Sequence, residues 1–406
     1  MAHRTPPSRP GGRGGTRLRS WRTAAVASAL LATLDVTSSG AAPFSTTLAT
    51  PRSGPAATGK DITYGLHVVA VDGRRFGVTD SVHVLTFDAT QDTVKVALAK
   101  NVVDGGKQTP RAMCRSTAGC VAAVNGDYFD VTRHGTLDPG DDVGGIIQNC
   151  VLLHTPEVAH QQANLDAQSV SQGLNWSSTV DVNGVDVTIN AVNLELPISY
   201  STVHLPLTGT LLFTPSYALK TPTAAGRVTY EFTQVDSSVS PTTINSTTQL
   251  DFVAQTTRAV NVSPGQVDIS APVGSALDSL QAGEVVNLTT TSSAGCDSIG
   301  GHPILLNHGV IVPIAPADTF MTRPFARSVI GWTASGQTVI MAVEGTDGKS
   351  GATARQLVGM LQSLHVVTAL DLDGGGSTAF YVKDHPFTNA ASAERAVSTS
   401  LVVVRN

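Results

Sequence analysis

The sequence predicts a fold with many strands in its first and middle parts and one strand–helix–strand unit near its C-terminus. Residues 180–267 consist largely of short Val-, Thr- and Ile-rich runs separated by turn dipeptides, which is the pattern of successive strands. Two apolar runs of strand length, 337–345 and 366–372, flank a segment whose apolar residues recur with helical spacing. With 406 residues, of which 41% are hydrophobic and 14% charged, the chain can bury a large core in one or two domains.

The N-terminus has the layout of a secretory signal peptide. Six arginines precede an apolar stretch at 24–34, and small residues follow at 38–42. The apolar stretch is too short to span a bilayer comfortably, so a retained anchor is the alternative, and no later segment is long and apolar enough to span one. We predict a signal peptide at 1–42, a flexible leader at 43–59, and a secreted chain, extracellular or cell-wall associated, with no membrane span after signal removal.

The charge balance of the remaining chain is acidic. The whole sequence has 26 basic and 31 acidic residues, and removing the first 42 residues leaves 20 basic and 30 acidic ones. A net negative chain is poorly suited to an anionic polymer or an anionic membrane surface. The composition therefore argues against nucleic acid as a partner, and the arginine- and alanine-rich leader indicates a bacterial source.

Cysteine usage agrees with export. The four cysteines form no CxxC pair, and no histidine lies at zinc-site spacing from them. We predict one disulfide between Cys114 and Cys120, which flank a short loop, and a second between Cys150 and Cys296. The two other pairings of four cysteines remain as alternatives.

The first folded segment, 60–114, is predicted to be rich in strands, at 62–71, 78–87 and 93–99. A further apolar strand within 121–130 leads into a polar turn that contains a glycine. Asn125 and Asp127 come just past its buried run. They either form an ordinary turn or face a binding site.

The stretch 368–381, TALDLDGGGSTAFY, carries most of the predicted chemistry. Asp371 and Asp373 are two residues apart on an apolar strand, so both are expected to project from one face. The next residues are Gly374, Gly375, Gly376 and Ser377. Three glycines permit a sharp turn or a close approach of the backbone to a ligand, and the serine adds a hydroxyl. The pattern predicts the floor of an active site, and the alternative is a tight turn with solvated aspartates.

Glu344 ends the apolar run that precedes the predicted helix. Thr353 and Gln356 have capping-box spacing at the start of this helix. A strand–helix–strand unit normally makes a right-handed crossover between parallel strands. Glu344 is therefore expected at the same sheet edge as Asp371 and Asp373.

Two further residues stand next to apolar strands. His302 follows a diglycine in IGGHPILLNHG (299–309), where it is either a catalytic acid or a satisfied histidine in a turn. Arg327 enters a strand in RPFARSVIG (323–331). Its planar guanidinium could bind a phosphate in bidentate fashion, or it could form a structural salt bridge to one of the aspartates.

Seven segments resemble, in order, the phosphodiester glycosidase domain family. This family includes the lysosomal uncovering enzyme, N-acetylglucosamine-1-phosphodiester alpha-N-acetylglucosaminidase, and many secreted bacterial proteins. The segments are VNGDYFD (124–130), INAVNLE (189–195), LLFTPSYALKT (211–221), IGGHPILLNHG (299–309), ARSVIG (326–331), VIMAVEG (339–345) and LDLDGGGST (370–378). The resemblance spans about residues 115–406.

The resemblance implies an α+β fold in which mixed sheets with few helices enclose the site. It also implies an enzyme that hydrolyses a sugar-1-phosphodiester at the anomeric bond and releases the sugar. For a secreted bacterial chain, the expected substrates are phosphodiester-linked glycans of the cell envelope or its surroundings. The alternative is a secreted module that binds a glycan phosphate, or supports the envelope, without turnover.

Hydrolysis of this bond calls for a carboxylate on the sugar side and a cation for the phosphate. We assign Asp373 or Asp371 as nucleophile or general base, Glu344 as the second carboxylate, and Arg327 as the phosphate ligand. Asn125 would bind sugar hydroxyls, and the backbone N–H groups of residues 374–377 would form an oxyanion nest.

Three further residues are compared with the family pattern: Asp127, His302 and Arg395. Many relatives have glycine where this chain has Asp127, which adds a carboxylate near the site. His302 inherits no role, because the position after the diglycine varies among relatives. Arg395 stands where relatives carry an arginine before the last strand, and it either contacts the phosphate or packs its stem against the sheet.

A metal would suit the same substrate. Asp371, Asp373 and Glu344 could hold Ca²⁺ or Mg²⁺ through their oxygens, and the sequence does not separate a metal site from a carboxylate pair. An Asp-x-Asp motif also occurs in glycosyltransferases, but an exported chain meets no nucleotide sugars. In aspartyl phosphatases this motif usually lies at the first strand, whereas here it lies near the end of the chain.

Overall fold

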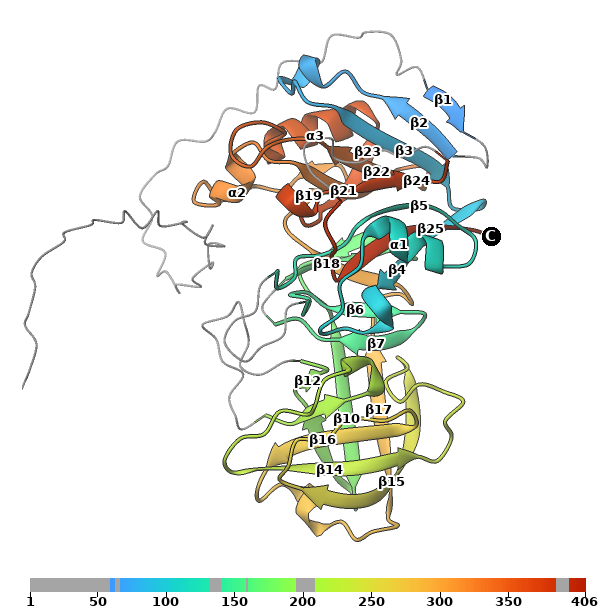
Figure 1. Cartoon of the computed structure of the whole chain (residues 1–406), viewed down its shortest axis with the longest axis vertical. Coiled ribbons are helices and arrows are strands. Elements are labelled where there is room, and N and C mark those ends of the chain that lie inside the picture. The colour runs from blue at the N-terminus through green and yellow to red at the C-terminus, as the bar shows by residue number, and fades with distance from the viewer. Residues whose placement is uncertain (1–58, 63–65, 132–139, 158–159, 195–208, 385–393) are drawn as a thin grey trace, which may run out of the picture. The chain divides into compact units, whose positions relative to one another are not determined.

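A computed structural model describes residues 59–62, 66–131, 140–157, 160–194, 209–384 and 394–406 (Figure 1). The predicted signal peptide and nearly all of the predicted leader lie outside the described residues. Four β-sheets and three α-helices make up the described part of the chain. The expectation of mixed sheets with few helices is confirmed.

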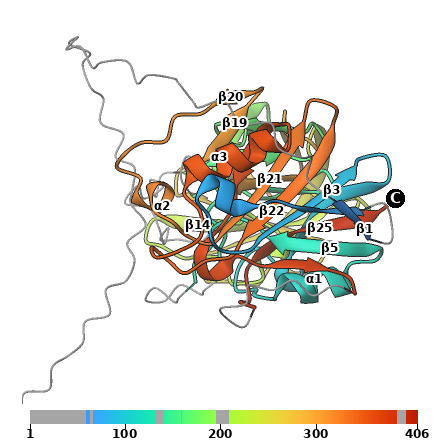
Figure 2. The same ribbon diagram turned by 90° about the horizontal axis from the view of Figure 1, so that it is seen from above.

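The first eight-stranded sheet carries the C-terminal motifs. Its strands, in spatial order, are β1 (Gly59–Ile62), β2 (Leu66–Ala70), β3 (Val82–Asp88), β22 (Gln337–Val343), β21 (Arg327–Thr333), β23 (Val366–Asp371), β19 (Ile304–Asn307) and β20 (Val310–Ile311). Helix α3 (Ala354–Ser363) covers one face of this sheet (Figure 2). The short helix α2 (Thr319–Thr322) precedes β21.

Helix α3 begins where the capping box was predicted. The Thr353 hydroxyl accepts from the backbone N–H of Gln356, and the Gln356 side chain accepts from the backbone N–H of Thr353. Leu357, Met360 and Leu361 are fully buried against the sheet. The apolar spacing of the sequence thus becomes the buried face of the helix.

The predicted crossover is only partly recovered. Helix α3 does connect β22 to β23, but both strands pair antiparallel with β21, which lies between them. A directly paired parallel βαβ unit is therefore not confirmed. Because β22 and β23 run the same way on either side of β21, their C-terminal ends still reach the same edge of the sheet.

A four-stranded sheet packs against the face of the first sheet that α3 does not cover. Its strands are β24 (Phe380–Val382), β5 (Cys120–Asn125), β25 (Thr399–Arg405) and β4 (Asp92–Leu98). Buried Leu85, Ile330 and Leu370 of the first sheet share one hydrophobic core with Val124 and Leu401 of the second. Segment 60–114 supplies strands to both sheets.

Two more sheets are built from the middle of the chain. One has the order β7 (Val151–His154), β6 (Ile146–Gln148), β18 (Ser298–Gly301), β8 (Gln161–Asn164) and β9 (Ser169–Ser171). The other has the order β11 (Val185–Ile189), β10 (Trp176–Val182), β17 (Val285–Ser292), β15 (Ser246–Thr256), β14 (Arg227–Gln234), β16 (Gln266–Pro272), β13 (Leu211–Phe213) and β12 (Ala191–Val192). This eight-stranded sheet has its own hydrophobic core, which includes Tyr230, Phe232 and Ile269. The strand-rich reading of this region is confirmed.

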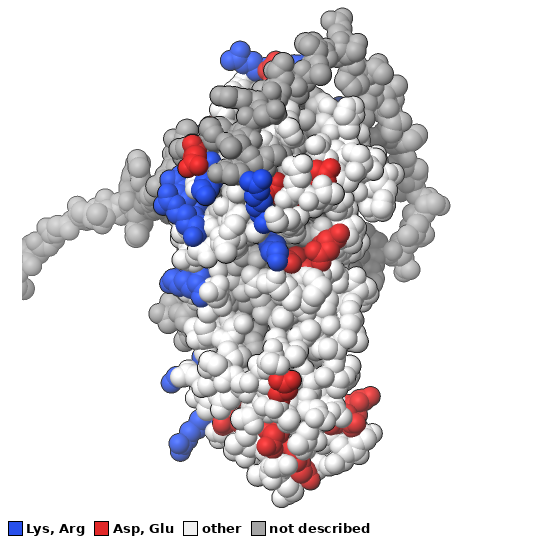
Figure 3. Space-filling model, turned by 90° about the vertical axis from the view of Figure 1, so that its right-hand side faces the viewer, with Lys and Arg blue, Asp and Glu red and all other residues white. Residues whose placement is uncertain are grey.

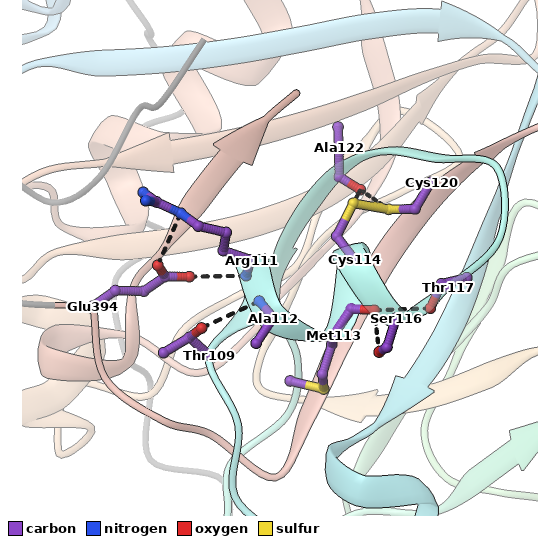
Figure 4. The surroundings of a disulfide bond; sticks show 10 residues. All are labelled: Thr109, Arg111, Ala112, Met113, Cys114, Ser116, Thr117, Cys120, Ala122 and Glu394. Atoms are coloured by element: carbon purple, nitrogen blue, oxygen red, sulfur yellow. Dashed lines mark hydrogen bonds and ion pairs between the residues drawn. A yellow bond between two sulfur atoms is a disulfide. The ribbon is translucent and has the colours of Figure 1, made fainter. Parts of the chain in front are cut away.

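Helix α1 (Pro110–Ser116) is fixed at both ends (Figure 4). The Thr109 hydroxyl caps its start by accepting from Ala112 N, and Cys114 near its end is joined to Cys120 on β5. The second disulfide joins Cys150 to Cys296. Both disulfides have the predicted pairing.

On the face drawn in Figure 3, basic side chains gather along one side, and acidic side chains dominate the lower end, which Figure 1 places on β14–β17. Among the described residues, no helix is long and apolar enough to cross a membrane.

Candidate active site

The last residue of β23, Asp371, forms a buried ion pair with the first residue of β21, Arg327. The Arg327 Nη1 to Asp371 Oδ2 distance is 3.2 Å, and both side chains are fully buried. Burial raises the pKa of the Asp371 carboxyl, and the charge of Arg327 opposes that rise. Asp371 is thus enclosed in the fold and paired with Arg327.

Each nitrogen of the Arg327 guanidinium donates to another group of the protein. It donates to the carbonyl oxygens of Phe320 and Ala352 and to Asp371. Its carbon lies 4.3 Å from the ring centre of Phe320 and 5.4 Å from that of Phe325. The structure thus contains the salt bridge that was the alternative to a phosphate clamp, and it offers no exposed guanidinium surface to a phosphate.

Asp373 lies just past the strand and is half-buried. Its backbone N–H donates to Gly126 O, and its side-chain Oδ1 accepts from Gly374 N at 2.8 Å. Burial raises the pKa of Asp373 to about 7, although Ser377, the Gly374 N–H and Arg395 favour its charged form. Of the two aspartates, Asp373 is therefore the one that can meet a substrate.

Asn125 positions Asp373. Its side-chain amide donates to Asp373 O at 2.7 Å, and its Oδ1 accepts from the Ser328 hydroxyl at 2.6 Å and from Ala379 N at 3.1 Å. The side chain is fully buried. Asn125 thus ties β5, β21 and the loop after β23 together through its own side-chain groups.

The three glycines after Asp373 allow close approaches by three different segments. A Cβ at Gly374 would lie 2.7 Å from Ala326 O, and one at Gly376 would lie 2.4 Å from Arg395 Nη2. Gly375 has a φ of +57°, and a Cβ there would lie 2.8 Å from Asp347 Oδ1. Side chains at these positions would push the surrounding groups away from Asp373.

Most of the backbone N–H groups that were expected to form an oxyanion nest at residues 374–377 donate hydrogen bonds within the protein. Gly374 N donates to the Asp373 side chain, Gly375 N to Ala326 O, and Ser377 N to Gly374 O. These bonds hold the short 3-10 turn Gly375–Ser377 in place. The loop therefore holds Asp373 in place, and few of its backbone N–H groups are left to bind a ligand.

Arg395 is the exposed cation beside Asp373. Its Nη1 donates to the Ser377 hydroxyl at 3.3 Å, and its guanidinium lies over Gly376. The preceding residue, Glu394, is anchored to α1, because its carboxylate accepts from Arg111 N at 2.9 Å (Figure 4). The chain thus holds an accessible positive charge next to the half-buried carboxylate.

Asp127 is fully buried and bonded to a histidine that the sequence analysis did not single out. Its Oδ1 lies 2.9 Å from His160 Nε2 and also accepts from Tyr128 N at 2.7 Å. The negative charge of Asp127 contributes to the raised pKa of Asp373. Asp127 therefore belongs to the same electrostatic site.

Tyr128 and His302 lie beside this pair. The Tyr128 hydroxyl donates to His302 O at 3.0 Å, and burial with nearby carboxylates raises its pKa well above the ordinary value. The His302 ring bonds Gln161 Oε1 at 2.8 Å and Asp318 Oδ2 at 3.0 Å. The ring of His302 is thus bonded on both nitrogens at the border of the site.

Glu344 does not join the aspartates. Val343 pairs with Arg327, so Glu344 is one residue further and belongs to the opposite face of the sheet. There its Oε1 bonds His83 Nε2 at 2.9 Å. The expected convergence of Glu344 with Asp371 and Asp373 is not found.

The residues proposed for a divalent ion therefore have other partners: Arg327 for Asp371, the glycine loop for Asp373 and His83 for Glu344. Over the part of the chain that the structure describes, no group of three His, Cys, Asp or Glu side chains is placed to hold a metal ion. These three carboxylates do not fit a shared ion.

Sequence reasoning missed His160, Asp318 and Asp347. His160 and Asp318 carry no local motif, and β8 and α2 bring them to the site. Asp347 follows Glu344 by three residues, and only the fold shows that it touches Gly375.

The family model for phosphodiester glycosidase matches residues 235–404. This range contains the last four of the seven resembling segments, and the first three lie outside it. No curated protein matches the sequence significantly. The resemblance to the phosphodiester glycosidase family is confirmed by the match over 235–404.

Three solved structures are similar to this chain. A hypothetical protein from Synechocystis has 19% identity and a TM-score of 0.63, over 87% of this chain and 64% of that chain. A protein from Burkholderia pseudomallei has 18% identity and a TM-score of 0.60, over 80% and 73%. The zebrafish N-acetylglucosamine-1-phosphodiester alpha-N-acetylglucosaminidase catalytic domain has 15% identity and a TM-score of 0.40, over 87% and 85%. The first two show a shared fold.

Proposed function

We propose that this chain, whose residues 235–404 match the phosphodiester glycosidase family, hydrolyses a sugar-1-phosphodiester at the anomeric bond and releases the sugar. The observation that carries the proposal is that half-buried Asp373 begins the glycine loop and exposed Arg395 contacts the same loop at Ser377 and Gly376. A carboxylate and a cation side by side suit a substrate in which a sugar carbon is bonded to an anionic phosphate.

In this reaction the bond between the anomeric carbon and the phosphate oxygen breaks, and an oxygen from water becomes bonded to that carbon. Asp373 stabilises the positive charge that develops on the sugar, as nucleophile or general base. Arg395 binds the phosphate oxygens as negative charge builds on the departing group. A phosphate monoester is a stable anion, so its departure needs little help from an acid.

The substrate class follows from the same charges and from the export features of the sequence. The basic leader and the two disulfides support a secreted protein, extracellular or cell-wall associated. Phosphodiester-linked glycans of the cell envelope or its surroundings combine a sugar and a phosphate in the required way. We therefore propose them as the natural substrates.

The test is incubation of the mature protein with a panel of alkyl and aryl sugar-1-phosphodiesters. Release of free sugar by the wild type, and its loss in Asp373→Asn, would support the hydrolase. Binding of the same compounds by the wild type without any released sugar would instead identify a glycan-phosphate-binding module.

A further inference from the structure

Asp127 is a carboxylate that the fold buries in an unusual way. One oxygen, Oδ1, bonds His160 and Tyr128, and the other, Oδ2, is buried without a hydrogen-bond partner. A Cβ at Gly144 would lie 2.0 Å from Oδ2, and one at Gly300 would lie 1.9 Å from it. Gly144, in the bend before β6, and Gly300, on β18, thus leave the space that this carboxylate occupies.

A buried, half-satisfied carboxylate destabilises the fold unless it has another use. Its strongest partner is the imidazole of His160, at 2.9 Å, where the side chains of His160 and Asp127 are 9% and 0% exposed. A carboxylate only accepts hydrogen bonds, so His160 Nε2 must carry the proton. This fixes the tautomer and leaves Nδ1 as the basic nitrogen of the neutral ring.

The His160 ring lies in the same site as Asp373. Tyr128 contacts it edge-on, with ring centres 5.7 Å apart, and His302 lies at 6.3 Å. Asp127 raises the pKa of both Asp373 and Tyr128, so the pair is within electrostatic reach of the candidate catalytic carboxylate. The charged or titratable groups next to His160 include Asp127, Tyr128 and His302, and Asp142 interacts in turn with the charge of Asp127.

We propose that Asp127 and His160 form the proton-transfer pair of this enzyme, an inference that rests on the proposed function. With Asp373 stabilising the positive charge on the sugar, His160 Nδ1 takes a proton from the water whose oxygen bonds to the anomeric carbon, and Asp127 stabilises the resulting imidazolium. The carbon–oxygen bond to phosphate breaks, and its electron pair leaves with the phosphate monoester. The proton then passes from His160 to solvent. His160 is the catalytic residue, and Asp127 is a positioning residue that sets its tautomer.

The tautomer is tested without any substrate. In wild-type protein labelled with ¹⁵N at histidine, NMR should find the His160 ring protonated on Nε2 and unprotonated on Nδ1 when the ring is neutral. Asp127→Ala removes the oxygen that accepts from Nε2, so the preference for the Nε2 tautomer should be lost. A wild-type ring protonated on Nδ1 would overturn the pair.

Kinetics tests the role of the charged pair. Asp127→Asn and His160→Gln should each lower kcat by about 100-fold, the usual scale of a lost general base. The matched control is Glu344→Gln, which also removes a 2.9 Å carboxylate–imidazole contact, in this case with His83 of β3. It should change kcat by less than about threefold, because it leaves the proton-transfer pair intact.

The two proposals fail in different ways. A wild type that turns over no member of the phosphodiester panel would refute the proposed hydrolase. An active wild type whose kcat survives both Asp127→Asn and His160→Gln would refute the proton-transfer pair alone. Equal losses in Glu344→Gln and Asp127→Asn would also overturn it, because the effect would then be structural.

Discussion

Asp371 and Asp373 are two residues apart in one motif, yet the fold uses them in opposite ways. Asp371 ends β23, is fully buried and is paired with Arg327. Asp373 lies past the strand, is half-buried and stands beside exposed Arg395. The difference teaches that the acidic motif contains one residue that holds the sheet and one that we propose to meet the substrate.

The end of the strand causes this division. Within β23, side chains alternate between the two faces, and Asp371 is on the α3 side with Val329 and Ala369. After Leu372 the chain leaves strand geometry, and Asn125 and Gly126 of the second sheet bind the backbone of Asp373. The two aspartates therefore have different partners despite their even spacing.

The largest effect is expected from Asp373→Asn. Removing the reacting charge should lower kcat/KM by about 10⁴-fold, or about 5.5 kcal/mol, since each tenfold loss is about 1.4 kcal/mol. The isosteric amide keeps the packing, so the free energy of unfolding should change by less than about 2 kcal/mol. Steady-state kinetics and urea unfolding measure the two quantities. Retained activity would remove Asp373 from the catalytic role.

Arg327→Met should act on stability instead. The substitution leaves Asp371 as an unpaired buried carboxyl and should lower the free energy of unfolding by about 3 to 5 kcal/mol. Equilibrium urea denaturation measures this loss. A stable Arg327→Met protein with a selective defect on phosphodiesters would restore Arg327 as a phosphate ligand and contradict the division described above.

Arg395→Gln should have a smaller and substrate-dependent effect. Loss of the cation should lower kcat/KM about 10- to 100-fold on a sugar-1-phosphodiester, because the departing phosphate loses a charged hydrogen bond. Cleavage of an uncharged aryl glycoside of the same sugar should barely change. Equal losses on both substrates would show that Arg395 supports the glycine loop rather than the phosphate.

The smallest effect concerns pH. The pKa of Asp373 is raised to about 7, and the ionised form is the reactive one, so kcat/KM should fall as pH drops below about 7. A raised pKa also means that the folded state binds this proton more tightly than the unfolded chain. Stability should therefore rise as pH falls from about 7 toward 4, and less so in Asp373→Asn. Urea midpoints at pH 5 and pH 8 compare the two proteins, and identical pH trends would contradict the assignment.

Much of the local structure could be predicted from the sequence because it depends on neighbouring residues. The capping box of Thr353 and Gln356, the strand on each side of α3 and the Cys114–Cys120 disulfide are all of this kind. The aspartates and glycines of the C-terminal motif were also predicted to follow one another at the end of a strand. Each of these signals lies within a few positions along the chain.

The roles within the site depend on long-range placement, which spacing does not reveal. Glu344 misses the aspartates because a shift of one residue on β22 reverses its face. Arg327 is enclosed by α2 and by the loop at Ala352, neither of which its own strand predicts. His160 reaches Asp127 only because sheets formed by distant segments meet at this point.

The most direct test of the central claim is to follow the oxygen of water. Hydrolysis of a sugar-1-phosphodiester in H₂¹⁸O, followed at once by mass spectrometry of the phosphate monoester, shows which bond breaks. Cleavage at the anomeric carbon leaves the phosphate product without ¹⁸O and places the label in the released sugar. Incorporation of ¹⁸O into the phosphate would show attack at phosphorus and would contradict a phosphodiester glycosidase.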